Sequence, residues 1–195
     1  MRREVITDPA ARRVRFAHYF TLAYCLLAIT IALILRDTAL FATTEFRNNE
    51  VGVIAYYPAN WLLDTSTSVL RATDTARSGF KTVIEVQVLP FAPRMSARNV
   101  IDSLTLARQG SLQDYRNLAS REIMLRNQDV AIINEYQYVY APNDPFLQTL
   151  STTVVGRDVL VIRRNQAILI TFQTDARTLE EDLAIFDRFL DSLEY

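Results

Sequence analysis

Residues 82–90 read TVIEVQVLP, and this stretch decides the class of the folded domain. Its apolar residues alternate with Glu85 and Gln87, so one side of an extended chain is apolar and the other is polar. A period of two predicts a half-buried β-strand, and Pro90 ends it. The stretch therefore predicts a sheet in the surrounding domain.

Further strand-like runs lie on both sides of this stretch, with two helices among them. One helix is expected to begin at the N-cap Ser96 and to end at Gly110 as C′ residue. The other begins at Thr178, where Thr178 and Glu181 fit a capping box. The strand runs are contiguous and do not alternate with helices, which predicts an α+β domain with an antiparallel sheet of about six strands. The other expected strands are 51–58, 66–73, 118–126, 129–141, 149–164 and 167–174.

Towards the N-terminus, residues 16–35 form an uninterrupted apolar run, FAHYFTLAYCLLAITIALIL. A helix of this length spans about 30 Å, the thickness of the hydrocarbon core of a bilayer. The run is longer than the core of a typical signal peptide, and no good small-x-small cleavage site follows it. It is therefore predicted to be a retained transmembrane helix.

The charges flanking this run predict its orientation. Residues 1–15 carry five arginines against Glu4 and Asp8, and basic segments remain in the cytoplasm. We therefore expect a single-pass protein of the cell inner membrane, with a cytoplasmic N-terminus and a periplasmic or extracellular C-terminal domain. The predicted parts are a basic tail (1–15), a transmembrane helix (16–35), a juxtamembrane connector (36–50) and an extracytoplasmic α+β domain (51–195).

The composition excludes several classes of function. The formal net charge is −1, which disfavours electrostatic binding of nucleic acid. The chain has one His and one Cys, His18 and Cys25, and both lie in the apolar run. A His- or Cys-based catalytic site or metal cage in the outer domain is thereby excluded, and no metal or cofactor is expected. Catalysis by carboxylates alone remains an open but weaker alternative.

The segment Tyr56-Tyr57-Pro58-Ala59-Asn60-Trp61, the order of elements and the closing Phe189–Leu193 resemble the PsbP family. These are extrinsic proteins of photosystem II and their bacterial relatives, and the resemblance covers about residues 44–195. It implies a PsbP-like antiparallel sheet with flanking helices, in a non-catalytic module that docks on a membrane complex. Two departures are the transmembrane helix and the lack of histidine in the outer domain, so a His-based metal role does not carry over.

Within the apolar run, three residues are candidates for contacts in the membrane. His18 could ligate a pigment magnesium or a haem iron, or could simply be an interfacial histidine. Ala28 and Ala32 are small residues spaced by four, a pattern that permits close packing against another helix.

In the outer domain, aromatic and basic residues are the candidates for docking. Trp61 and Tyr57 form an exposed recognition surface or cap one end of the core. Arg163 and Arg164, at a predicted hairpin tip, either dock on a partner or lie in a solvated turn. A stripe of tyrosines on one strand face is a binding patch or a half-buried surface under a helix; its members are Tyr136, Tyr138 and Tyr140.

Two functions remain open on the sequence. The leading hypothesis is a non-catalytic single-pass accessory subunit that stabilises or covers the outer face of an energy-transducing membrane complex, such as a bacterial photosynthetic reaction centre or an electron-transport complex. Its partners would be other subunits, contacted through the helix and the outer domain, the lipid bilayer and a soluble electron carrier. The alternative is a membrane-anchored extracytoplasmic protein that binds a small ligand or a cell-surface component, which predicts a pocket in the outer domain.

Overall fold

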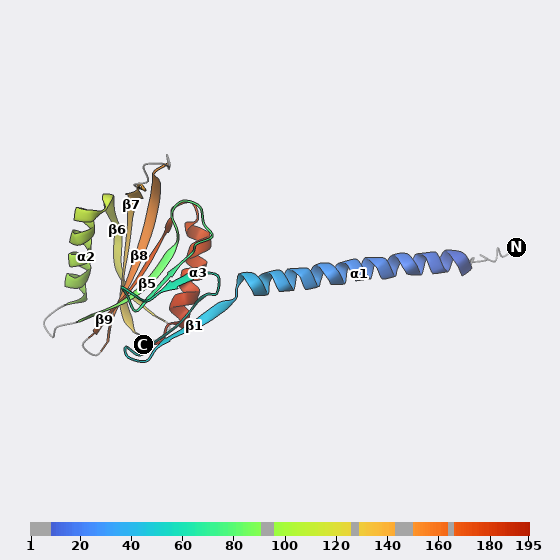
Figure 1. Ribbon diagram of the computed structural model, residues 1–195, viewed down its shortest axis with the longest axis horizontal. Helices are drawn as coiled ribbons and strands as arrows, with labels where there is room; N and C mark the ends of the chain where they lie inside the picture. The colour runs from blue at the N-terminus through green and yellow to red at the C-terminus, as the bar shows by residue number, and fades with distance from the viewer. Residues whose placement is uncertain (1–8, 91–95, 126–128, 143–149, 164–165) are drawn as a thin grey trace. The chain divides into compact units, whose positions relative to one another are not determined.

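The computed structural model describes residues 9–90, 96–125, 129–142, 150–163 and 166–195. The chain divides into two units, Met1–Ala42 and Thr43–Tyr195. The first unit is built on helix α1 (Pro9–Leu40) and the second contains all the strands and the other two helices of the described chain (Figure 1).

Helix α1 contains the predicted apolar run. Its segment Phe16–Thr38 is long and apolar enough to cross a membrane, and the side chains of this segment are exposed. The hydroxyls of Thr21 and Thr30 each donate to the backbone carbonyl four residues earlier, at 2.9 Å, so their polarity is satisfied within the helix.

The juxtamembrane connector predicted over 36–50 has regular structure along most of its length. Helix α1 continues to Leu40, and strand β1 (Thr43–Asn48) begins after only two further residues. No glycine or proline interrupts residues 36–42, and the Phe41 amide still donates to the Asp37 carbonyl at 3.0 Å. The helix therefore has no local reason to stop where the apolar run stops.

The second unit contains a seven-stranded antiparallel sheet in the order β3-β4-β5-β9-β8-β7-β6 and a separate antiparallel hairpin of β1 and β2. This confirms the α+β class and the antiparallel sheet, with more strands than the six expected. The remaining strands are β2 (Val53–Pro58), β3 (Leu62–Asp64), β4 (Leu70–Thr73), β5 (Val83–Pro90), β6 (Gln113–Met124), β7 (Val130–Tyr140), β8 (Thr152–Arg163) and β9 (Gln166–Asp175).

Two helices cover opposite faces of the sheet, as Figure 1 shows with the sheet between them. Helix α3 (Leu179–Ser192) packs with the β1–β2 hairpin over the larger core, where Phe172 stacks on Phe186 with ring centroids 4.7 Å apart. Helix α2 (Ala97–Ser111) packs over a smaller apolar cluster on the other face, through Val100 and Ile101. The sheet therefore has a large dry face and a face that α2 covers with few apolar contacts.

The helix caps correct the sequence analysis in part. Ser96 is the N-cap of α2, since its side chain accepts from the Asn99 amide at 3.2 Å. Gly110 lies inside α2 and not after it, because the helix continues to Ser111. The capping box is wrong: the Thr178 hydroxyl makes no cap hydrogen bond and donates instead to the Asp182 carboxylate at 2.8 Å.

Asp182 fixes the start of α3 to the sheet. Its carboxylate is fully buried and accepts hydrogen bonds from four side chains. Arg77 donates to Oδ1 at 2.7 Å, and three threonine hydroxyls donate to Oδ2: Thr82, Thr174 and Thr178. One charged group thus joins α3 to β9 and to the segment before β5.

We expect Asp182→Asn to destabilise the outer domain by about 3 kcal/mol, because the change removes the fully buried anion of Arg77, which keeps only the less buried Asp74 and Glu181. The single oxygen of an amide also cannot accept from all four donors. Urea unfolding of the full chain in detergent, followed by Trp61 fluorescence, measures this. Glu180→Gln is the matched control, since Glu180 is exposed in the same first turn of α3. Equal stability of the two variants would contradict the role assigned to Asp182.

Candidate binding site

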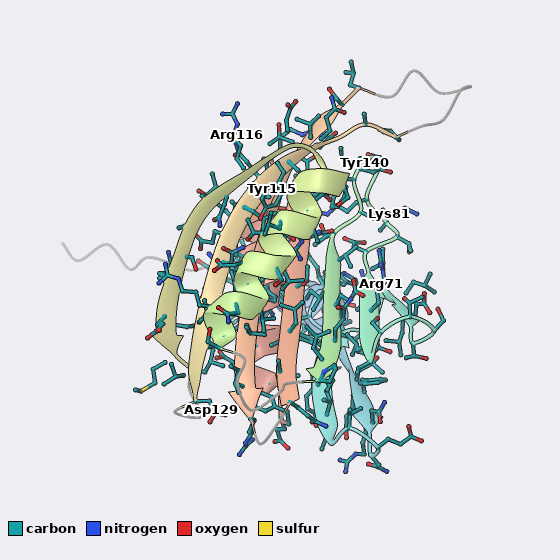
Figure 2. The ribbon with its side chains drawn as sticks, turned by 90° about the vertical axis from the view of Figure 1, so that its left-hand side faces the viewer. Arg71, Lys81, Tyr115, Arg116, Asp129 and Tyr140 are labelled. Atoms are coloured by element: carbon teal, nitrogen blue, oxygen red, sulfur yellow. The ribbon has the colours of Figure 1, made fainter. Side chains whose placement is uncertain are left out.

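A row of polar side chains crosses the sheet on the face that α2 covers. The strand registers place five residues side by side, one from each of five neighbouring strands from β7 to β4: Asn134, Asp158, Thr171, Glu85 and Arg71. We call these residues the polar row. Figure 2 looks onto this face, with α2 lying over part of the sheet and Arg71 to one side of the helix.

The centre of the polar row is an ion pair between sheet and helix. Asp158 is fully buried and accepts a bidentate pair of hydrogen bonds from Arg108 of α2, one of them at 3.0 Å to Oδ1. The Thr171 hydroxyl donates to the same carboxylate at 2.9 Å. A buried charge requires this degree of pairing, so the contact holds α2 in place on a polar surface.

Tyr136 supports the same arginine from below. The Arg108 guanidinium lies 4.3 Å from the centroid of the Tyr136 ring, and the Tyr136 hydroxyl accepts from Gln173 at 3.0 Å. The ring fits because the residue opposite it on β8 is Gly156. A Cβ atom on Gly156 would lie 2.2 Å from Cζ of Tyr136.

Electrostatics keep these groups in fixed charge states. Burial by itself lowers the pKa of Arg108, but its hydrogen bonds to Asp158 and the charge of that carboxylate raise it overall. Burial and the nearby Asp158 charge raise the pKa of Tyr136, and burial raises the pKa of Tyr138 to about 12. At neutral pH the arginine is therefore charged and both phenols are protonated.

A cavity of about 300 Å³ lies between α2 and strands β6 and β7. Asn134 lies beside the cavity on the same face of the sheet: Ser120, its register partner, and Ile132, two residues away on β7, both line the cavity. Asn134 is fully buried, yet neither its Oδ1 nor its Nδ2 has a hydrogen-bond partner among the described residues. Residues of both charge signs complete the lining, and these are Arg98, Asp102, Arg121 and Glu122. The cavity can accept a small polar molecule.

A second, more apolar hollow of about 850 Å³ lies at the end of β7 and the start of β8. Phe80, Tyr140 and Leu150 contribute to its lining, together with Asp175 and Arg177. Asp175 and Arg177 are bound to each other at 2.6 Å, so their charges are already satisfied.

The structure buries the aromatic docking candidates of the outer domain. Trp61 and Tyr57 are only 6% and 8% exposed and pack in the core under α3, which accounts for both without a partner. The tyrosine stripe lies beside α2: Tyr136 and Tyr138 are buried, and Tyr140 is 37% exposed. The stripe therefore differs along its length: its first two tyrosines belong to the interior, and only the third reaches the surface.

The remaining candidates are exposed or lie outside the described residues. Arg163 ends β8, donates to the Tyr195 carbonyl and lies 5.4 Å from the centroid of that ring, whereas Arg164 is outside the described residues. His18, Ala28 and Ala32 lie on α1 with exposed side chains, and their roles stay predictions. Within the described residues, no group of three or more His, Cys, Asp or Glu side chains could hold a metal ion.

The charged residues that attach α2 to the sheet were not predicted from the sequence. Arg108 and Asp158 are 50 residues apart, and no local pattern links them. One signal was present: Asp158 has the same strand phase as Val154 and Leu160, so the alternation placed a carboxylate on a buried face.

The domain is of the α+β class, with an antiparallel sheet between two helices. This arrangement is the PsbP-like fold. No protein-family profile matches the chain, and no curated protein matches it. Solved structures do match, at identities that show the fold alone.

One of these structures is cyanobacterial PsbP (CyanoP) from Synechocystis, with a TM-score of 0.56 and 11% identity over 78% of this chain and 92% of that one. LpqN of Mycobacterium tuberculosis, described as involved in cell envelope biogenesis, matches with a TM-score of 0.52 and 11% identity. The match covers 78% of this chain and 89% of LpqN. The Ran-binding protein Mog1p of Saccharomyces cerevisiae matches with a TM-score of 0.51 and 11% identity. The match covers 78% of this chain and 95% of Mog1p. The expectation of a PsbP-like fold is therefore confirmed.

We expect Gly156→Ala to destabilise the domain by about 1–3 kcal/mol, because the added methyl group forces Tyr136 out of its position under Arg108. Gly110→Ala is the control: a Cβ there meets no atom within 4 Å, and alanine in a helix interior is favourable by about 0.5–1 kcal/mol. Chemical unfolding compares the two. A Gly156→Ala protein as stable as the parent would show that the Tyr136 position is not constrained.

Proposed function

We propose that this chain is a membrane-anchored accessory protein, in which α1 crosses the membrane and the PsbP-like domain docks on a membrane complex. The observation that carries the proposal is the direct succession of a membrane-length helix and a folded domain. The segment Phe16–Thr38 presents exposed apolar side chains, and β1 begins at Thr43. Side chains of this kind need lipid or a partner helix to cover them.

The proposed topology follows from the flanking charges. The arginines before Phe16 favour a cytoplasmic N-terminus, which would put the outer domain on the other side of the inner membrane. LpqN, which has this fold and is described as involved in cell envelope biogenesis, is consistent with a role of the fold at the cell envelope.

The outer domain supports a docking function better than a catalytic one. Its fully buried carboxylates, Asp158 and Asp182, are each held by an arginine and by hydroxyl donors, so both serve to attach a helix to the sheet. The resemblance to the PsbP family suggests an energy-transducing complex, photosynthetic or electron-transporting, as the partner. In that setting the domain would cover the outer face of the complex or shape a site for a soluble electron carrier.

Purification in mild detergent, followed by mass spectrometry, tests this proposal. We expect the full-length chain, with α1 retained in its intact mass, to co-migrate with integral membrane subunits. Replacing Ala28 and Ala32 by leucine should reduce this association severalfold, because bulky residues prevent close helix packing. Ala23→Leu is the control, since Ala23 lies on the opposite side of the helix. A monomer in native membranes, or a cleaved α1, would refute the proposal.

A second function, binding of a small polar ligand, is favoured by the cavity between α2 and β6. Its lining offers donors and acceptors of both charges, and the unpartnered Asn134 amide lies next to it. An unsatisfied buried amide costs about 1–3 kcal/mol, which a water or ligand group recovers.

Ligand-observed NMR with a panel of amino acids and monosaccharides tests this second function on the full chain in detergent. Binding should disappear in Ser120→Phe, which fills the cavity, and persist in Ser103→Phe, which changes an exposed position on α2. No binding to the parent protein, or equal binding to both variants, would exclude the cavity as a site for these compounds.

A further inference from the structure

The turn that follows β2 lies at the end of the β1–β2 hairpin where the chain enters from α1. The register pairs Thr43, the first residue of β1, with Pro58, the last residue of β2. The chain arriving from α1 and the turn leaving β2 are therefore neighbours at the same end of the ladder. Paired Cα atoms in such a ladder are about 5 Å apart.

This turn carries no charge, and Asn60 is its one polar side chain. Residues 51–63 read VGVIAYYPANWLL, without a single Asp, Glu, Lys or Arg. The Trp61 amide donates to the Pro58 carbonyl at 3.0 Å and its side chain is buried, so the turn is fixed to the core. Leu62, next to this anchor, is 61% exposed. Asp64, on the same strand face, is the first charged residue after the turn.

The covalent chain limits how far Thr43 can lie from the end of α1. From Leu40 to Thr43 the chain reaches at most about 11 Å, even when fully extended. Phe41, within this stretch, is 56% exposed. A membrane crossed by Phe16–Thr38 therefore has its surface within a short distance of Thr43, and of the turn paired with it.

We propose that the turn Pro58–Leu62 contacts the lipid surface of the bilayer that α1 crosses, with Leu62 inserted among the lipid headgroups and upper acyl chains. The inference rests on the membrane anchoring proposed above. Because the turn is uncharged, the contact depends on apolar burial and needs no anionic lipid. Asp64 limits the contact, since its carboxylate remains in water. The domain is then held against the membrane at one end and presents its other surfaces to a partner.

Spin labelling of the full-length protein in vesicles of phosphatidylcholine alone tests this contact. The native Cys25 is first replaced by alanine, and Leu62→Cys then carries the nitroxide. The control is Leu118→Cys on β6, a residue of similar exposure at 53%. We expect the label at position 62 to collide severalfold less with a water-soluble nickel complex than the label at position 118, and more often with oxygen, which concentrates in lipid.

A third label, on the native Cys25 of the otherwise unchanged chain, separates two ways of failing. If this label is also accessible to nickel, α1 does not cross the bilayer and the anchoring proposal fails as well. If it is shielded while positions 62 and 118 are equally accessible, only the lipid contact of the turn is refuted. Because the vesicles hold no other protein, shielding at position 62 cannot come from a protein partner. Near-UV circular dichroism of Trp61 verifies that each labelled variant is folded.

Discussion

The buried carboxylate of Asp182 is the interaction on which the outer domain depends most. Helix α3 closes the larger core. Among the described residues of its first turn, Asp182 is the one whose charged side chain is fully buried, and it joins the helix to the sheet. Four donors from different parts of the sequence converge on it. Removing any of these donors leaves a less satisfied charge, so the start of α3, β9 and the segment before β5 are energetically linked.

The two faces of the sheet are stabilised by different physics. Under α3, a large apolar cluster supplies most of the contact, and the Asp182 network is confined to the start of the helix, so stability there comes mainly from burial. Under α2, the contact is made by an ion pair, a cation–π contact and a small apolar cluster. Such polar contacts mainly fix the orientation of α2 on the sheet and add less to its stability. The α2 side also contains the cavity and Asn134, whose amide has no partner among the described residues, so the ligand of the second proposed function is expected on this side.

The sequence predicted the elements well where a short-range pattern exists. Alternation in 82–90 gave β5 almost to the residue, and Ser96 marked the start of α2 correctly. Errors arose where local signals conflict with tertiary contacts. Thr178 has the spacing of a capping box, but the buried Asp182 competes successfully for its hydroxyl.

The candidate site was the least predictable part, because its partners are far apart in the chain. Arg108 reaches Asp158 across 50 residues, and Arg77 reaches Asp182 across 105. Neither pairing produces a periodic pattern in the sequence. Trp61 shows the opposite case: it is conspicuous in the sequence, but it serves the core.

The Tyr136 ring lying over Gly156 has a consequence for how this domain can change during evolution. Any side chain at position 156 occupies the space of the ring, so a substitution there is tolerated only with a smaller residue at 136. That second change would remove the aromatic surface under Arg108 and weaken the attachment of α2. The two positions should therefore vary together among homologous chains, and chains that lack the pair should hold the helix of this face in a different way.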